Sequence, residues 1–204
     1  WGWKSIHCSV CDEMQEGSEV AIPYLVPAPT GTWKQDSKGW WYQYSDNTYA
    51  KNEILTINGV EYAFGANGYV VNGWYLDNGA YYYSTTSGLK RGWVKSGASW
   101  YYMDPSTGRM ATGWRTIGGS KYYFVSSGEM SVGWRSINGT YYYFMPSGAM
   151  ATDWVQSGAS WYYMDSTTGK MVTGFVDIGG MTYYMTASGA MATDWFQIGG
   201  KWYY

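Results

Sequence analysis

The sequence predicts an all-β protein, a solenoid of stacked two-stranded β-hairpins built from repeats of about 20 residues. The first supporting observation is a tryptophan, or another large apolar residue, that recurs every 19 to 21 residues. The second is a pair of turn residues, often Asn-Gly or Gly-Gly, between two short runs of β-favouring residues, which is the strongest short-range hairpin signal. The third is composition: 21% of the 204 residues are aromatic, and the 28 glycines recur too often for long helices.

Residues 133–152 show one complete repeat. Trp134 starts the first strand, Asn138-Gly139 forms a turn because both residues tolerate positive φ, and residues 141–144 form the second strand. A single two-stranded hairpin is only marginally stable in water. We therefore expect successive copies to bury their aromatic faces on one another.

Residues 1–30 differ from the rest, since they hold the only histidine, both cysteines and three of the five prolines. His7 is adjacent to Cys8, and Cys8 and Cys11 form a Cys-x-x-Cys motif. A zinc site needs four ligands and the chain has no second Cys or His pair, so we expect a short disulfide or two free thiols rather than a metal site. A catalytic Cys–His pair is less favoured still, because no orienting partner is evident. Residues 23–30 are interpreted as an extended, proline-rich linker.

The repeats are expected to occupy residues 31–204. The second unit is degenerate, with Ile54 in place of tryptophan, although Asn58-Gly59 keeps the turn. The last unit stops at Tyr204 with a hairpin and no trailing loop, so the sequence predicts eight whole units and a partial ninth. The residues that open the units are Trp33, Ile54, Trp74, Trp93, Trp114, Trp134, Trp154, Phe175 and Trp195.

Composition and motifs also argue against several classes of function. The formal net charge is −2 without a basic stripe, which argues against nucleic-acid binding, and the lack of any run of 18 apolar residues argues against a membrane span. Asp104 and Asp165 occupy the same position in two repeats, so we interpret them as turn residues rather than a general acid and base. With a single histidine and no nucleophile motif, we expect no enzyme activity and no cofactor. We recognise neither a signal peptide nor a wall-sorting tail, and expect a mature product or a fragment of a longer protein.

Residues 92–114 and 153–174 carry the pattern Gly-Trp-x4–5-Gly-x-Trp-Tyr-Tyr, followed by Ser-Gly-x-Met-Ala-Thr-Gly-Trp, nearly in full. This pattern resembles the choline-binding or cell-wall-binding repeats of Gram-positive surface proteins. Related repeats occur in the glucan-binding regions of glucansucrases and in the receptor-binding regions of large clostridial toxins. The resemblance implies a β-hairpin solenoid whose ligands are choline groups on teichoic acids, or glucans.

Choline suggests how the aromatic residues could form a site. A quaternary ammonium group neither donates nor accepts a hydrogen bond, so it is held by aromatic faces whose quadrupole attracts the cation. Side chains alternate across a strand, so we expect Trp154 and Trp161 to form two walls of a cage that Tyr184 of the next hairpin closes. The ligand-binding groups predicted in this way are Trp74, Tyr81 and Tyr102; Trp93, Trp100 and Tyr123; Trp134, Tyr141 and Tyr163; and Trp154, Trp161 and Tyr184.

Other positions are expected to pack rather than bind. A wall is expected to be missing where the pattern is broken, by Lys121 beside Trp114, Thr182 beside Phe175, Ala63 beside Trp33 and Trp40, and Glu61 in the degenerate unit. The middle tyrosines are expected to fill the core, namely Tyr101, Tyr122, Tyr142, Tyr162 and Tyr183. The repeat methionines are expected to fill gaps, namely Met110, Met130, Met150, Met171 and Met191.

The sequence therefore predicts a non-catalytic, secreted attachment module at the cell surface or cell wall. Its expected partner is the choline of cell-wall teichoic acid or a polysaccharide. Binding between any two hairpins is expected to be weak, and several such sites on one polymer would give a higher overall affinity through avidity. A glucan-binding module and a structural spacer rod remain the alternatives. We also expect an attached catalytic or effector domain outside this chain, and consider a homodimer formed through the exposed last hairpin.

Overall fold

The computed structural model describes residues 30–204, so His7, Cys8, Cys11 and most of the proline-rich linker lie outside the described residues. Residues 30–204 form nineteen β-strands and no helix. No helix in this part of the chain is therefore available to cross a membrane. The strands pair into nine antiparallel hairpins, which confirms the predicted all-β hairpin solenoid.

The hairpins follow one another along the chain. Their strands are β1 (Gly31–Asp36) and β2 (Gly39–Tyr44), β3 (Glu53–Ile57) and β4 (Val60–Phe64), β5 (Gly73–Asp77) and β6 (Ala80–Thr85) with the short β7 (Gly88–Leu89), β8 (Gly92–Ser96) and β9 (Ser99–Met103), β10 (Gly113–Ile117) and β11 (Ser120–Phe124), β12 (Gly133–Ile137) and β13 (Thr140–Phe144), β14 (Asp153–Ser157) and β15 (Ser160–Met164), β16 (Gly174–Ile178) and β17 (Met181–Met185), and β18 (Phe196–Ile198) and β19 (Lys201–Tyr203). Eight predicted opening residues lie on the first strand of a hairpin, and Trp195 immediately precedes β18.

The tight turns of the hairpins have the backbone geometry that their residues favour. Asn138 and Gly139 have φ values of 50° and 78°, so both central residues of that turn are left-handed, as a type I′ hairpin requires. In the β8–β9 hairpin only the first turn residue, Gly97, has a positive φ, of 60°, which is the pattern of a type II′ turn. Both turn types match the twist of the flanking strands, so the register of these two hairpins is set locally.

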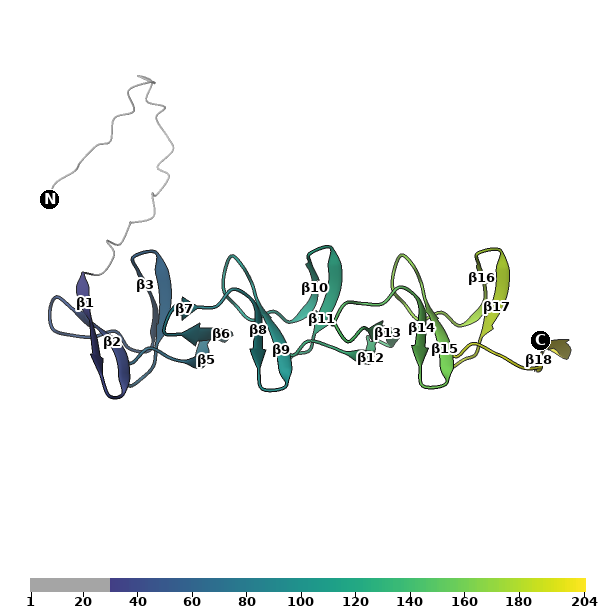
Figure 1. The fold of residues 1–204 in the computed structure, drawn as a ribbon, viewed down its shortest axis with the longest axis horizontal. Helices are drawn as coiled ribbons and strands as arrows, with labels where there is room; N and C mark the ends of the chain where they lie inside the picture. The colour runs from purple at the N-terminus through teal and green to yellow at the C-terminus, as the bar shows by residue number, and fades with distance from the viewer. Residues whose placement is uncertain (1–29) are drawn as a thin grey trace, which may run out of the picture.

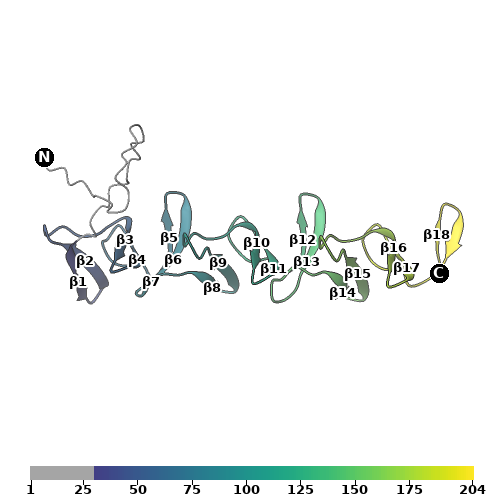
Figure 2. The same cartoon turned by 90° about the horizontal axis from the view of Figure 1, so that it is seen from above.

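The hairpins project from the axis of an extended rod in three directions (Figures 1 and 2). The β1–β2, β8–β9 and β14–β15 hairpins point one way, and the β3–β4, β10–β11 and β16–β17 hairpins point another. The β5–β6 and β12–β13 hairpins form the third row, which Figure 2 shows most clearly. Every third hairpin therefore has the same orientation, and the rod is not one continuous sheet.

The segments between hairpins join each unit to the one before it. Met130 follows the β10–β11 hairpin, and its backbone N–H donates to the carbonyl of Trp100 in the preceding hairpin at 2.8 Å. The N–H of the next residue, Ser131, donates to Tyr123 of its own hairpin at 2.8 Å. These two bonds bridge consecutive units and fix the rotation between them, and equivalent bonds recur along the chain.

The core lies along the axis of the rod, where the second strands end. One large residue in each of six hairpins is fully buried there, and each such side chain contributes roughly 1.5–3 kcal/mol through removal of its apolar surface from water. These residues are Phe64, Met103, Phe124, Phe144, Met164 and Met185.

The glycine of each linking loop packs closely on the loop before it. Gly128 has a φ of 85°, and a Cβ atom at this position would collide with the sulfur of Met110. Gly148, Gly169 and Gly189 make the equivalent contacts with Met130, Met150 and Met171. Four of the repeat methionines, Met110, Met130, Met150 and Met171, therefore fill space between loops as the sequence suggests, and three of them, Met130, Met150 and Met171, also line cavities.

The two longer loops contain the predicted aspartate turns. Asp104 Oδ1 accepts hydrogen bonds from the hydroxyls of Ser106 and Thr107, and Asp165 Oδ1 accepts one from the hydroxyl of Thr168. The hydroxyl of Ser106 holds the pKa of Asp104 below its ordinary value, and the hydroxyl of Thr168 does the same for Asp165. Both aspartates are thus turn residues, as predicted.

Candidate functional site

We call the contact between one hairpin and the next a joint, and name each joint after the residue that opens the earlier hairpin. In the Trp93 joint, the indole of Trp93 meets Trp100 of its own hairpin with ring centroids 6.4 Å apart and planes at 88°. Tyr122 of the next hairpin meets Trp93 at 5.0 Å and 68°. The three rings border a cavity of about 400 Å³, which Met130, Pro146 and Ser147 complete.

The Trp134 joint repeats this arrangement. Trp134 and Tyr162 have ring centroids 4.7 Å apart, and with Tyr141 they line a cavity of about 390 Å³. Met171, Ala187 and Ser188 complete the lining. Neither this cavity nor that of the Trp93 joint is lined by a charged side chain, so each presents aromatic faces, a thioether and small loop residues to a ligand.

Two further joints bring the same three kinds of ring together. Trp74 meets Tyr81 at 6.4 Å and Tyr101 at 4.7 Å. Trp154 meets Trp161 at 6.5 Å and Tyr183 at 5.0 Å. In the Trp74 joint the indole Nε1–H also donates to Ser96 Oγ at 3.1 Å, and Trp134 is held in the same way by Ser157. These hydrogen bonds orient the indole plane.

The structure corrects the tyrosine that closes each joint. Tyr102 is the cross-strand partner of Trp93 and contacts it at 5.1 Å, so it packs within its own hairpin. Because neighbours on a strand face opposite sides, Tyr101 instead reaches the preceding Trp74. In the same way, the predicted residues Tyr123, Tyr163 and Tyr184 contact the opening residues of their own hairpins, which are Trp114, Trp154 and Phe175.

The middle tyrosines therefore line the joints, where the sequence suggested that they only fill the core. Tyr122, Tyr142 and Tyr162 border cavities, and all three are partly exposed. These tyrosines could have been predicted from strand alternation, because the neighbour of a residue that faces its own hairpin must face the adjoining unit.

The Trp33 joint was predicted to remain unclosed because of Ala63. The structure shows that Tyr62, the preceding residue, meets Trp33 at 4.8 Å, and Trp40 meets Trp33 at 6.3 Å. Five joints therefore hold the three-ring arrangement, those of Trp33, Trp74, Trp93, Trp134 and Trp154.

The Ile54 joint, in the degenerate unit, contains an ion pair between two of the protein's own side chains. Glu61 stands where the three-ring joints have an aromatic wall, and Arg91 forms an ion pair with its carboxylate. A Cβ atom on Gly108 would collide with the Arg91 guanidinium, which here takes the place that methionine has in the loops that follow. The sequence indicated the lost wall and did not reveal that Arg91 replaces it.

The Phe175 joint keeps two aromatic contacts across hairpins, because Tyr203 meets Phe175 at 5.2 Å and Phe196 stacks on Tyr184 at 4.7 Å. Thr182 stands at the position of the missing wall, and its hydroxyl donates to Asp177 on the same hairpin. Among residues 30–204 no three His, Cys, Asp or Glu side chains are grouped as a metal site would require. The five three-ring joints offer aromatic faces for recognition.

Models of two repeat families match the chain. The choline-binding repeat matches residues 131–174 and 172–204, and the cell wall binding repeat matches residues 92–110 and 112–130. Together these matches include the Trp93, Trp134 and Trp154 joints.

Known proteins show the same likeness. CbpJ from Streptococcus pneumoniae TIGR4 is 33% identical over 81% of this chain and 67% of its own, with a TM-score of 0.72. Choline binding protein F from Streptococcus pneumoniae, solved in the presence of a peptidoglycan analogue, is 34% identical over 75% of this chain and 55% of its own, with a TM-score of 0.65. Glucosyltransferase-S from Streptococcus mutans is 35% identical over 96 residues, which are 45% of this chain and 6% of the enzyme. The matched region spans only part of each of these proteins, and the chain belongs to the choline-binding repeat family.

Proposed function

We propose that this chain is a non-catalytic attachment module that binds choline-type groups of cell-wall teichoic acid in the aromatic joints between its hairpins. The observation that carries the proposal is the repeated three-ring arrangement. In the Trp93 joint, Trp93, Trp100 and Tyr122 border one open cavity without a charged residue in its lining.

The cavity chemistry fits a quaternary ammonium group. Such a cation cannot form a hydrogen bond, so the surrounding π faces supply its attraction, worth about 0.5–2 kcal/mol per contact depending on desolvation. Trp93 is 38% exposed and Trp100 is 42% exposed, so the rings are reachable from solvent. A single joint of this kind binds weakly.

A rod with five three-ring joints, two of which border a cavity, gains strength from multivalency. Once one joint holds a polymer, the next binds at a high effective concentration, and overall avidity exceeds the affinity of either joint. The function is therefore attachment to a repeating polymer at the cell surface or cell wall, by a secreted protein. The similarity to 6% of Glucosyltransferase-S supports an attached catalytic or effector domain outside this chain.

Calorimetric titration with choline, with a soluble α-glucan titrated in parallel, tests this proposal. We expect saturable heat with choline that falls in Trp154→Ala, because that variant removes the opening wall of one joint. Trp195→Ala is the matched control, since Trp195 is 65% exposed and lies outside the five joints. Heat with the glucan alone would move the function to saccharide binding, and heat with neither titrant would leave a spacer rod.

A further inference from the structure

The Trp114 joint has the same backbone hydrogen bond as the Trp93 joint, but a different side chain forms one of its walls. The N–H of Met150 donates to the carbonyl of Lys121 at 2.7 Å, as that of Met130 donates to Trp100 at 2.8 Å in the Trp93 joint. Tyr142 meets Trp114 at 5.0 Å and 73°, which matches the contact of Tyr122 with Trp93. The joint is therefore intact, with a lysine in place of one aromatic ring.

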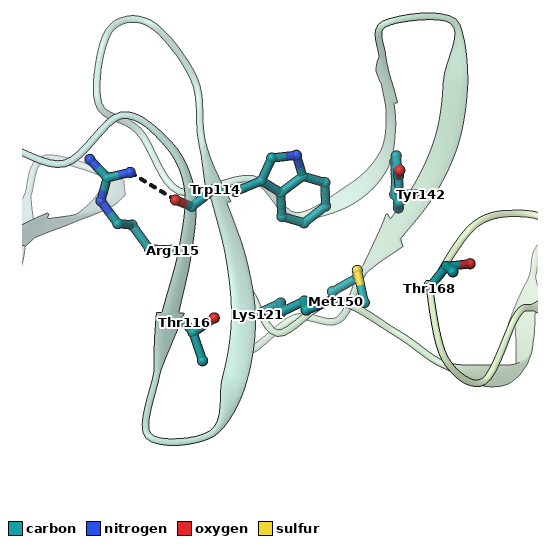
Figure 3. A pocket seen from close by; sticks show the side chains of 7 residues that line it. All are labelled: Trp114, Arg115, Thr116, Lys121, Tyr142, Met150 and Thr168. Atoms are coloured by element: carbon teal, nitrogen blue, oxygen red, sulfur yellow. Dashed lines mark hydrogen bonds between the residues drawn. The ribbon is translucent and has the colours of Figure 1, made fainter.

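A cavity of about 310 Å³ opens at this joint (Figure 3). Lys121 runs along it below the Trp114 ring and towards Met150, and Tyr142 faces it from the next hairpin. Arg115 also borders the cavity, but its guanidinium turns to the other side of the hairpin, where Nη1 donates to the carbonyl of Trp114 at 2.8 Å. Lys121 thus supplies the positive charge that faces the cavity.

This charge is not neutralised by the surrounding residues. No carboxylate lines the cavity, and the one ion pair between residues 30 and 204 joins Arg91 to Glu61. The lysines that lie over an aromatic ring in this range are Lys51 and Lys95, so the ammonium group of Lys121 does not fill its own joint as a cation–π partner. It remains available to a ligand.

We propose that the Trp114 joint binds a compact oxyanion, a phosphate ester or a carboxylate, instead of a quaternary ammonium group. An ammonium group donates three hydrogen bonds and accepts none, so it repels a second cation and pairs with anionic oxygens. Thr116, which also lines the cavity, adds a hydroxyl donor, and the Trp114 and Tyr142 rings cover the apolar part of the ligand. The module then recognises anionic and cationic groups of a polymer at adjacent joints, with the Trp93 and Trp134 joints on either side.

The test follows the indole N–H resonance of Trp114 by NMR, assigned with Trp114→Phe, at constant ionic strength. We expect inorganic phosphate, phosphorylcholine or acetate to shift this resonance saturably, and the ranking of the three separates phosphate from carboxylate recognition. Lys121→Gln should raise the Kd obtained from this titration at least tenfold. Lys34→Gln removes the same charge from an exposed position on β1, outside this cavity, and should leave the shift unchanged. The absence of a saturable shift, or equal weakening in both variants, would overturn the proposal.

A second variant separates this inference from the function proposed above. Lys121→Trp restores the wall that Trp100 and Trp161 provide in other joints, so it should lose the oxyanion response and gain a choline response at Trp114. If choline shifts no joint while phosphate still shifts Trp114, the attachment function fails and the oxyanion site stands. If choline shifts wild-type Trp114 as it does Trp93, the oxyanion site is wrong and the attachment function stands.

Discussion

Trp93 and Tyr122 belong to consecutive hairpins, and their rings meet with centroids 5.0 Å apart at 68°. The adjacent residue, Tyr123, contacts Trp114 within its own hairpin at 5.2 Å. Two neighbouring tyrosines thus have separate roles, one at the open joint and one in packing. The same division recurs at Tyr101 and Tyr102.

This division predicts different effects for two neighbouring substitutions. Tyr122→Leu removes one wall of the Trp93 joint, and we expect choline affinity there to fall roughly tenfold, because one desolvated cation–π contact is worth about 1–2 kcal/mol. Tyr123→Leu should leave that affinity unchanged and lower the melting temperature instead. Choline titration monitored at the Trp93 indole resonance gives the first quantity, and thermal unfolding gives the second. Equal effects of the two variants on affinity would show that the assignment is wrong.

The linking loops should be sensitive to a single added methyl group. Gly128→Ala and Gly133→Ala both place alanine at a positive φ, of 85° and 72°, which costs about 1–2 kcal/mol. Only Gly128 faces a close neighbour, the side chain of Met110, whereas a Cβ atom on Gly133 meets open space. We expect Gly128→Ala to destabilise the rod by up to a further ~1 kcal/mol, because the flexible Met110 side chain must move away from the added methyl group. Denaturant unfolding of the two variants measures the difference, and equal destabilisation would contradict the role given to the Met110 contact.

The degenerate joint should depend on its internal ion pair. Arg91→Ala removes the charge that pairs with Glu61 and the guanidinium that packs on Gly108. Both side chains are partly exposed, so the ion pair itself is worth less than about 1 kcal/mol, and we expect a drop of a few degrees in melting temperature. High salt should reduce the difference in melting temperature between the wild type and Arg91→Ala. Arg115→Ala is the control, because its guanidinium bonds to a backbone carbonyl; an equal drop would argue against a specific role for Arg91.

The aspartate turns should make the longer loops sensitive to acid. The hydroxyl of Ser106 stabilises the Asp104 carboxylate and holds its pKa below the ordinary 3.8, so its folded-state value lies below its unfolded-state value. Stability from this group is therefore present above pH 3.8 and is lost as the pH falls through the lowered folded-state value. Melting temperatures between about pH 6 and pH 2 measure the loss, which Asp104→Asn should reduce. Identical acid profiles would exclude this contribution of Asp104.

The fold was predictable from the sequence because its determinants are local. Asn138-Gly139 sets a type I′ turn by itself, and the spacing of residues such as Trp134 and Trp154 repeats the unit. The pairing of Trp93 with Trp100 also follows from one hairpin.

The contacts between units were harder to predict. Strand alternation indicates that Tyr122 faces the neighbouring unit, but the rotation that brings it to Trp93 depends on loop hydrogen bonds such as that from Met130 to Trp100, which lie outside the strands. Arg91 was missed for a related reason. Its loop is one residue shorter, since Gly88 precedes Trp93 by five residues while Gly128 precedes Trp134 by six, and the side chain extends to where methionine packs elsewhere.

Ligand binding between the hairpins can be measured by a choline titration followed at every assigned tryptophan indole N–H, because each joint is then reported separately. We expect saturable shifts at the joint tryptophans Trp33, Trp74, Trp93, Trp134 and Trp154, while Trp195 and Trp202, each 65% exposed, stay unshifted. Shifts at Trp195 and Trp202 alone, or no saturable shift at any joint tryptophan, would contradict ligand binding between the hairpins.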